Sequence, residues 1–361
     1  MQERPEKMPS IAPPRGRGAV SNPQGRFERV TRDPYDDGWW PEEELPPLAT
    51  TVRIEESRSI IARNDSPDIP FSQSINPYRG CEHGCVYCYA RPSHAYVGLS
   101  PGLDFETRLF AKANAAERLR EELARPGYAC QTIALGANTD PYQPIERRYR
   151  LTRQIIELLS ECDHPLSIVT KSSLIERDLD LLGSLAHRDL VHVYISIATL
   201  DRQLARRLEP RASAPPRRLE TVRRLAAAGI PTGVLVAPVI PALTDNDVEK
   251  VLEAARAGGA RWAGYVLLRL PHEVKDLFRQ WLTTHAPLKA GHVMKLVRET
   301  RGGRANDPRF GARMRGEGRL ADLIEDRFAI ACRRLGFNRE EGFLDHSRFR
   351  PPAVGPQLPL F

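Results

Sequence analysis

The sequence lacks the features that define several common classes of protein. It contains no apolar run that approaches the roughly 18–20 residues of a membrane-spanning helix. The first residues, Met1 to Lys7, are mostly polar and no apolar stretch follows them, so we expect no secretory signal. Cysteine is scarce, at 6 of 361 residues, which excludes a fold held together by many disulfides. We therefore expect a cytoplasmic protein with reduced thiols and no membrane contact.

What remains is a chain of ordinary size and mildly basic character. Its 361 residues accommodate one large α/β domain of roughly 200–250 residues with appendages, or two ordinary domains. The formal charge of +7 is compatible with a polyanionic partner but does not require one.

Three of the cysteines are concentrated in one short stretch. Cys81, Cys85 and Cys88 fall within eight residues, at a C-x3-C-x2-C spacing. Their odd number and short gaps do not suit disulfides, whereas three thiolates on one side of a loop suit a shared metal centre. Three cysteine ligands also leave one corner of a four-iron cluster open to a small molecule. Structural zinc is the alternative, but it needs four ligands and only His83 lies nearby.

The central region alternates between strand-like and helix-like segments. The strands are continuous aliphatic runs, as expected of parallel strands covered on both faces, at residues 74–78, 131–135, 166–170, 191–197, 232–239 and 264–268. The helices are expected at residues 111–124, 152–161, 175–186, 216–228, 245–257 and 273–283. Six such units predict an α/β fold, namely a partial (β/α)6 TIM-like barrel with parallel strands.

Two extensions flank this predicted core. Residues 1–70 are largely irregular and rich in Pro, Gly, Arg and Glu, so we expect a disordered N-terminal segment or one that drapes over the core, with Trp39-Trp40 holding it in place. Residues 71–285 form the core, and residues 286–361 form a basic C-terminal extension. A further helix is expected near residues 320–335, because its apolar residues recur at helical spacing.

Polar side chains follow several of the predicted strands. Asn138 and Thr139 come after the second strand, Lys171 comes after the third, and Ser196 lies near the end of the fourth. In barrels of this type the active site lies at the carboxyl ends of the strands, so these residues should share one mouth. The alternatives are a plain turn at residues 136–144, a solvated lysine and a core serine with satisfied hydrogen bonds.

The cysteine motif resembles the signature of the radical SAM superfamily, C-x3-C-x-aromatic-C, with Tyr87 as the aromatic residue. The resemblance implies that Cys81, Cys85 and Cys88 bind a [4Fe-4S] cluster and that S-adenosyl-L-methionine (SAM) occupies the fourth iron. It implies a radical SAM enzyme: an external donor supplies an electron, and SAM is cleaved to methionine and a 5′-deoxyadenosyl radical.

The resemblance also implies roles for the residues at the mouth. Asn138 or Thr139 is the candidate for the methionyl amino group, and Ser196 suits a ribose hydroxyl. Arg211, in Glu209-Pro210-Arg211, suits a carboxylate, and the apolar lip that begins at Ala237 suits the adenine. The full set of candidate SAM contacts is Tyr87, Asn138, Thr139, Lys171, Ser196, Arg211 and Ala237.

More narrowly, the chain resembles the spore photoproduct lyase branch of this superfamily. This resemblance rests on Tyr87-Cys88-Tyr89 and on residues 138–142, 170–172 and 236–238. It implies repair of a thymine dimer in DNA, in which a cysteine at the carboxyl end of the second strand returns a hydrogen. Here that strand ends in Gly136-Ala137, and Cys130 stands at its other end. Tyr87 and Tyr89 remain as candidate catalytic residues for relaying a hydrogen.

The C-terminal extension carries two further signals. Arginines are interleaved with glycines and Phe310 between residues 295 and 319, a composition that suits phosphate contact and base stacking; a solubilising loop is the alternative. The last residues, Gln357–Phe361, resemble the Q-L-x-L-F peptide by which bacterial repair proteins dock on the DNA sliding clamp; the alternative is a tail folded back on the barrel.

We therefore expect a radical SAM enzyme that acts on nucleic acid, with repair of a DNA lesion as the specific hypothesis. Two alternatives stay open. One is a non-catalytic iron–sulfur protein that binds nucleic acid or the sliding clamp, and the other is a radical SAM enzyme that acts on a small metabolite.

Overall fold

The computed structural model describes residues 14–28, 48–340 and 342–353. Trp39-Trp40 and the terminal peptide Gln357–Phe361 therefore lie outside the described residues. Within those residues, no helix is both long enough and apolar enough to cross a membrane.

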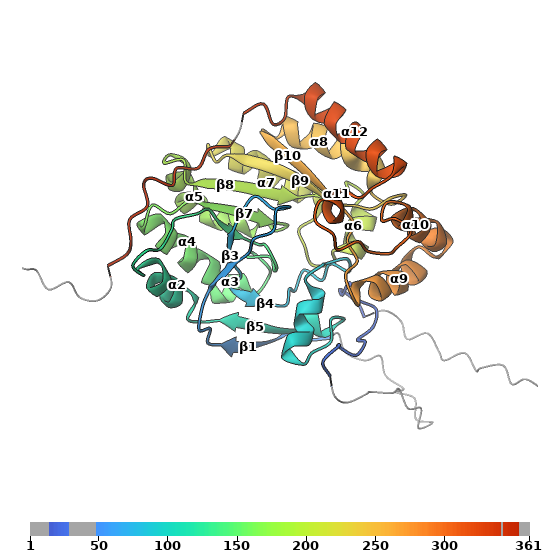
Figure 1. The fold of residues 1–361 in the computed structure, drawn as a ribbon, viewed down its shortest axis with the longest axis horizontal. Helices are drawn as coiled ribbons and strands as arrows, with labels where there is room; N and C mark the ends of the chain where they lie inside the picture. The colour runs from blue at the N-terminus through green and yellow to red at the C-terminus, as the bar shows by residue number, and fades with distance from the viewer. Residues whose placement is uncertain (1–13, 29–47, 341, 354–361) are drawn as a thin grey trace, which may run out of the picture.

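A seven-stranded sheet forms the centre of the fold (Figure 1). Its strands, in spatial order, are β10 (Trp262–Leu267), β9 (Thr232–Val239), β8 (Val191–Ser196), β7 (Leu166–Thr170), β6 (Ile133–Leu135), β3 (Gln73–Ile75) and β2 (Ile61–Arg63). The strands from β10 to β3 pair in parallel, and β2 is an antiparallel edge strand. The predicted α/β half-barrel of six parallel strands is thus confirmed, and β7 and β9 have the predicted bounds.

Helices pack along the outer side of this sheet (Figure 1). Those between or after the parallel strands are α2 (Ala115–Leu123), α3 (Glu146–Tyr149), α4 (Leu151–Glu161), α5 (Leu179–Ala186), α6 (Arg202–Leu208), α7 (Pro215–Ala227), α8 (Val248–Ala257) and α9 (Val274–His285). Short 3-10 turns, η2 (Ser173–Asp178) and η3 (Asp245–Asp247), lead into α5 and α8. Apolar side chains from the strands and from α2, α4, α5, α7 and α8 form the main core, because each of these helices turns an apolar face inward. Helices α6 and α9 contribute to a second apolar cluster.

A second, three-stranded sheet lies beside the half-barrel, with the order β1 (Thr51–Glu55), β5 (Arg108–Lys112) and β4 (Tyr78–Arg79). It corrects two predictions. The predicted strand 74–78 is split into β3 and β4, because Pro77 at the break has no amide hydrogen to donate. The helix predicted from residue 111 begins only at Ala115, because the buried residues Leu109 and Ala111 alternate with half-buried residues as part of β5. The short helices α1 (Asp104–Thr107) and η1 (Arg91–Val97) flank this sheet.

Three further helices follow the half-barrel: α10 (Pro287–Glu299), α11 (Ala312–Arg315) and α12 (Arg319–Leu335). Helix α12 has the predicted position and packs against α8. Helix α10, which the sequence reasoning did not predict, packs against α9 through Val293, Met294 and Val297 (Figure 1). We call residues 300–319 the basic loop.

Candidate active site

The cysteine loop, residues 79–91, follows β4 and is shaped by two glycines in the left-handed region. Gly80 has φ +72° and Gly84 has φ +69°. A Cβ atom on Gly80 would lie 2.6 Å from a Leu109 methyl group, so only glycine fits there. Two turns follow, in which the amide of Gly84 donates to Cys81 O at 3.2 Å and the amide of Cys88 donates to Cys85 O at 3.2 Å. These turns place the cysteines on successive bends of one loop.

The three thiols lie close enough to influence one another, and all are free. Burial raises the pKa of Cys85 to about 12, with nearby Glu209 raising it and Lys171 lowering it. Burial likewise raises the pKa of Cys81 and of Cys88, and the other thiols of the loop raise the pKa of Cys81 further. Thiolates in this pocket therefore need a positively charged partner, which iron would supply.

This donor set fits an iron–sulfur cluster that is bound by three cysteines. The remaining cysteines, Cys130, Cys162 and Cys332, lie apart from the loop, so the loop offers three ligands. In the described part of the chain, no three His, Cys, Asp or Glu side chains converge as ligands of one metal ion. Structural zinc therefore lacks a ligand set among these residues, whereas in a cluster each cysteine binds its own iron.

A fully buried ion pair stabilises the cysteine loop. Arg91 pairs with Glu106, and neither side chain is exposed. The Arg91 guanidinium also donates to Cys85 O at 2.8 Å and to Gly84 O at 3.1 Å. The pair therefore fixes the backbone that carries the second cysteine.

Residues 14–28 cover the same loop, so for this stretch the structure favours a draped segment over a disordered one. The amides of Gly18 and Ala19 donate to the Glu106 carboxylate at 2.9 and 2.8 Å. A Cβ atom on Gly18 would lie 1.8 Å from Gly84 O, so the two backbones touch. Arg17 donates to Glu106 O at 3.0 Å. The sequence signal was Arg15-Gly16-Arg17-Gly18, which we interpreted only as irregular.

Asp140 joins the cysteine loop to the sheet, a role that sequence reasoning missed. Its carboxylate lies 3.2 Å from His83 Nδ1 and accepts hydrogen bonds from the Thr170 hydroxyl at 2.7 Å and the Lys171 amide at 2.8 Å. Burial alone would raise the pKa of Asp140, but His83 and these hydrogen bonds lower it to about 2. Asp140 lies in the turn predicted after the second strand, beside the residues that we selected.

Tyr87 lies in a buried network. Its hydroxyl donates to Glu209, which also pairs with Arg218, and all three side chains are at most 8% exposed. Arg218 donates to Ser196 O at 2.8 Å, and the amide of Val86 donates to the α6 residue Leu208 at 3.1 Å. The aromatic residue of the motif therefore ties the cysteine loop to the end of β8.

Three predicted site residues form one hydrogen-bonded chain across adjacent strands. Lys171 Nζ, after β7, donates to Ser196 Oγ at 3.1 Å, at the end of β8. Ser196 Oγ in turn donates to Ala237 O of β9 at 3.1 Å. Burial raises the pKa of Cys88 and the charge of Lys171 partly opposes this rise, so that charge reaches the cysteine loop. The carboxyl ends of these strands and the cysteine loop thus share one mouth.

The remaining predicted SAM contacts lie around the same mouth. Thr139 is buried and its hydroxyl donates to Tyr78 O at 3.1 Å, so it supports the fold. The Asn138 side chain is half-buried at the rim. Arg211 pairs with Glu82 of the cysteine loop at 2.9 Å.

Tyr89 reaches across the mouth. Its side chain is 46% exposed, its hydroxyl donates to Ala137 O just after β6, and the Arg269 guanidinium lies 5.2 Å from its ring centre. Cys130 lies before β6, at the opposite end from Ala137. The hydroxyl of Tyr89 therefore lies beside the carboxyl end of β6, where the resemblance implies a cysteine and where this chain has Gly136-Ala137.

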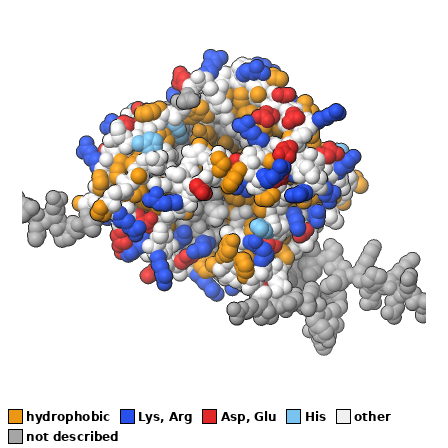
Figure 2. Space-filling model, viewed as in Figure 1, with side chains coloured by type: hydrophobic (Ala, Val, Ile, Leu, Met, Phe, Trp, Pro, Cys, Tyr) orange, Lys and Arg blue, Asp and Glu red, His pale blue; other side chains and the backbone are white. Residues whose placement is uncertain are grey.

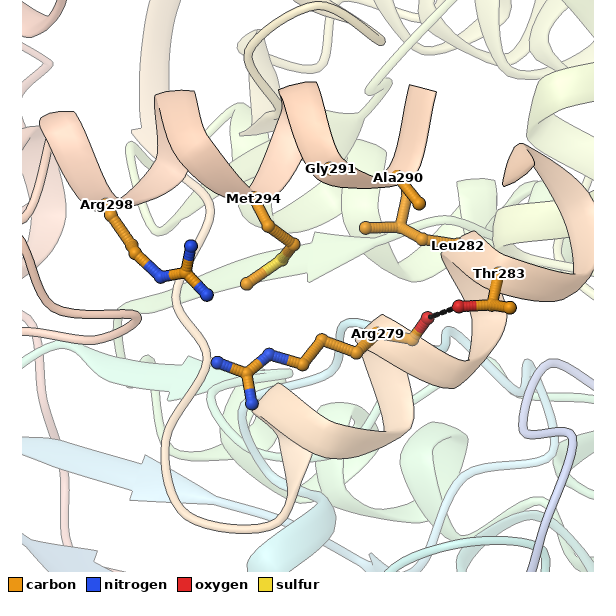
Figure 3. Close-up of a pocket in the computed structure, with 7 residues that line it drawn as sticks. All are labelled: Arg279, Leu282, Thr283, Ala290, Gly291, Met294 and Arg298. Carbon is orange, nitrogen blue, oxygen red and sulfur yellow. Dashed lines mark hydrogen bonds between the residues drawn. The ribbon is translucent and has the colours of Figure 1, made fainter. Parts of the chain in front are cut away.

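A separate surface pocket of about 280 Å³ lies between α9 and α10. It is lined by Arg279, Leu282, Thr283, Ala290, Gly291, Met294 and Arg298 (Figure 3). None of these residues belongs to the cysteine loop or to the strand ends, so this pocket is not the candidate active site.

Comparison with known proteins agrees with this geometry. Residues 75–255 match the radical SAM superfamily model. An uncharacterised protein of Mycobacterium tuberculosis (strain H37Rv) is 38% identical over 278 residues, covering 73% of this chain and 82% of the relative. A radical SAM Nalpha-GlyT isomerase of Pseudomonas phage M6 is 28% identical over 197 residues, covering 52% of this chain and 38% of the relative.

Among solved structures, spore photoproduct lyase complexed with dinucleoside spore photoproduct has a TM-score of 0.59 at 16% identity, over 79% of this chain and 80% of that one. A mutant of that lyase with bound AdoMet has a TM-score of 0.57 at 18% identity, over the same shares of the two chains. At such identities the likeness shows a shared fold. With the match to the family model over residues 75–255, the chain belongs to the radical SAM superfamily and is a radical SAM enzyme.

Proposed function

We propose that Cys81, Cys85 and Cys88 bind a [4Fe-4S] cluster, that SAM occupies the open iron, and that the enzyme acts on nucleic acid. The observation that carries the proposal is that three free thiols lie on one loop at the mouth of the half-barrel, with the charge of Lys171, which bonds Ser196, acting on Cys85 and Cys88. When bound, the cluster would supply the electron that cleaves SAM to methionine and a 5′-deoxyadenosyl radical.

The residues of the chain would bind and orient this chemistry. Lys171 places a positive charge near the thiols, which suits both an anionic cluster and the SAM carboxylate. Ser196 has its hydroxyl engaged by Lys171 and Ala237, so a ribose hydroxyl would have to exchange with one of these bonds. Residues 14–28, the covering segment, shield one side of the cysteine loop from water at Gly18, which favours control of a reactive radical.

One likeness supports nucleic acid as the substrate. The fold is shared with a lyase whose solved complex holds a dinucleoside spore photoproduct. Because Tyr89 and Ala137 stand at the carboxyl end of β6, we propose a reaction that needs no cysteine there to return a hydrogen.

Anaerobic reconstitution tests the radical chemistry. Purified protein is loaded with iron and sulfide, reduced with dithionite and mixed with SAM, and 5′-deoxyadenosine is quantified by mass spectrometry. The wild type should form 5′-deoxyadenosine, and Cys85→Ala should lose the product together with the iron. Cys162→Ala is the matched control, because it removes a buried thiol at the end of α4. A wild type that holds iron yet forms no 5′-deoxyadenosine contradicts the proposal.

Labelled DNA tests the substrate class. If the substrate is DNA, deuterium from nucleoside-labelled DNA should appear in 5′-deoxyadenosine, because hydrogen abstraction transfers that atom. Transfer from a labelled small metabolite, with none from DNA, would establish the small-metabolite alternative.

We also propose that Gln357–Phe361, outside the described residues, docks on a DNA sliding clamp. Leu360 and Phe361 would fill an apolar pocket, with Gln357 as the polar anchor, and flanking prolines would reduce the ordering cost. Deletion of the last two residues should abolish co-purification with the clamp; unaltered co-purification contradicts the proposal.

A further inference from the structure

Arg269 lies at the mouth of the half-barrel, next to the cysteine loop. It comes two residues after β10 ends, and its guanidinium lies 5.2 Å from the ring centre of Tyr89. Tyr89 directly follows the third cysteine of the motif, so the contact holds this positive charge at the entrance to the candidate active site.

Among the residues that the structure describes, no carboxylate forms an ion pair or a hydrogen bond with Arg269, although the charge of Asp68 acts on it. Its Nη1 contacts Met314 Sδ at 3.5 Å, and its Nε is buried without a hydrogen-bond partner. The nearby carboxylate of Asp68 is already engaged, because it pairs with Arg313 and accepts the amide of Gly311 at 2.6 Å. Burial lowers the pKa of Arg269 and the charge of Arg313 lowers it further, whereas Tyr89 and Asp68 act in the opposite direction. A half-buried guanidinium with an unused donor is suited to receive an anion.

The basic loop presents an aromatic ring against Arg313, whose charge acts on Arg269. Phe310 is 60% exposed, and the Arg313 guanidinium stacks on its ring, 4.6 Å from the centre. The loop is held in place because Arg313 pairs with Asp68 and Arg309 pairs with Asp307. Arg313 therefore links Phe310 to the surroundings of Arg269, and the exposed face of Phe310 is available for stacking.

We propose that Arg269 binds a phosphate of the substrate strand and that a neighbouring base stacks on Phe310. The inference deepens the proposed function, on which it rests, by naming residues that recognise nucleic acid. An arginine beside an exposed aromatic ring matches the way proteins hold single strands, in which charge tracks the backbone and rings stack on bases. The SAM carboxylate is a second source of the same oxyanion chemistry, so the experiment separates the two.

A rival anion site exists on the outer helices. In the α9–α10 pocket, Arg279 and Arg298 reach toward the same space beside Met294 (Figure 3). Arg279 already lies 3.2 Å from Asp276. Arg298 is exposed and carries the same charge as Arg269, which makes it a matched control.

Fluorescence anisotropy with a labelled single-stranded 12-mer of oligothymidylate, measured over a range of salt concentrations, tests the proposal. In the full-length, cluster-loaded protein, Arg269→Gln should weaken binding about tenfold and flatten the salt dependence by about 0.7 in the log–log slope, as loss of one phosphate contact requires. Phe310→Ala should also weaken binding by about tenfold, because it removes a stacking platform. Arg298→Gln should bind the oligonucleotide as the wild type does. Arg269→Lys, which keeps the positive charge, should bind it more tightly than Arg269→Gln does.

Each other outcome overturns the inference in a recognisable way. Unchanged affinity in Arg269→Gln and Phe310→Ala, alongside a wild type that binds, refutes the inference and leaves the proposed function standing. Loss of SAM affinity without loss of oligonucleotide affinity in Arg269→Gln assigns the arginine to SAM instead. If Arg298→Gln weakens oligonucleotide binding as much as Arg269→Gln does, binding depends on overall positive charge or on the α9–α10 pocket, and the inference is refuted. A wild type that binds no oligonucleotide refutes the nucleic-acid substrate as well, while the 5′-deoxyadenosine assay still reports on the radical chemistry.

Discussion

The cysteine loop and the basic loop are built from similar residues and are used differently. Both contain glycines in the left-handed region and arginines paired with acids. In the cysteine loop, the Arg91–Glu106 pair is fully buried and bonds the backbone that carries a cysteine. In the basic loop, Arg309 is 61% exposed and its partner Glu317 is 50% exposed. The Arg91–Glu106 pair of the first loop is therefore fully buried, whereas at least half of each side chain in the Arg309–Glu317 pair of the second loop is exposed.

The glycines of the two loops show the same contrast. A Cβ atom would meet other atoms within 3 Å at Gly80 and at Gly84, whereas it would meet nothing within 4 Å at Gly302 and at Gly303. Close packing therefore restricts the cysteine loop, and only backbone conformation restricts these positions of the basic loop.

The arginines of the basic loop do not form a single basic surface. The arginines of the basic loop find acids from other parts of the chain, since Arg313 pairs with Asp68 and Arg315 pairs with Glu325. Arg301 is buried instead, where it donates to backbone carbonyls of Leu268 and Ala312. In Figure 2, Lys and Arg side chains on the visible face are interspersed with Asp and Glu rather than gathered into one basic patch. A nucleic-acid contact in this region would therefore depend on a few residues rather than on overall charge.

The largest expected effect comes from removing the buried carboxylate. Glu106→Gln should destabilise the protein by about 3–5 kcal/mol, because it leaves Arg91 charged and unpaired in the interior. Loss of iron binding should accompany it, since the cysteine backbone loses its support. Urea denaturation and iron content measure the two effects. The matched variant Glu317→Gln, at an exposed pair, should cost about 0–1 kcal/mol. Equal costs in the two variants would contradict the contrast between the loops.

The motif and the strands could be predicted because their information is local. The cysteines lie within eight residues, and strands such as β9 are continuous aliphatic and β-branched runs. The contacts that hold the two loops in place could not be predicted, because their partners are distant in the sequence. Gly18 and Glu106 are 88 residues apart, and Arg313 and Asp68 are 245 residues apart. No spacing in the sequence reveals such pairs.

Helix α10 was missed for a different reason. We interpreted its end as part of a charged stretch, although Val293, Met294 and Val297 recur at helical spacing and are buried. Tyr87 shows how far the prediction of site residues could go. The motif identified this residue, but its hydrogen-bond partner Glu209 lies 122 residues later in the chain and could not be predicted.

An intermediate effect is expected at the contact between the covering segment and the loop. Gly18→Ala should destabilise the protein by about 1–3 kcal/mol, because the added methyl group would overlap Gly84 O. Residues 14–28 should then exchange amide hydrogens faster, which mass spectrometry can follow.

Gly302→Ala is the control for that substitution. Its φ of +58° carries a strain of about 1 kcal/mol, but no atom lies within 4 Å of the new methyl group. It should therefore leave hydrogen exchange in residues 14–28 unchanged. Equal exchange in Gly18→Ala and the wild type would show that the segment does not depend on this contact.

The smallest expected effect is a pH dependence in the basic loop. Hydrogen bonds from the Arg309 side chain and amide lower the pKa of Asp307 from 3.8 to about 2. Since the folded pKa is the lower one, this interaction stabilises the protein above pH 3.8 and is lost as the pH falls from about 4 to about 2. Asp307→Asn should remove no more than about 1 kcal/mol at neutral pH, because Arg309 is largely exposed.

The difference in unfolding free energy between Asp307→Asn and the wild type, measured in urea, should therefore shrink as the pH falls below about 4, over the window set by the Asp307 pKa. Added salt should shrink it too, because the Arg309 side chain of this pair is 61% exposed to solvent. A difference that persists at pH 2 and in high salt would mean that Asp307 acts through buried packing. The basic loop would then resemble the cysteine loop, and the contrast between the two would have to be abandoned.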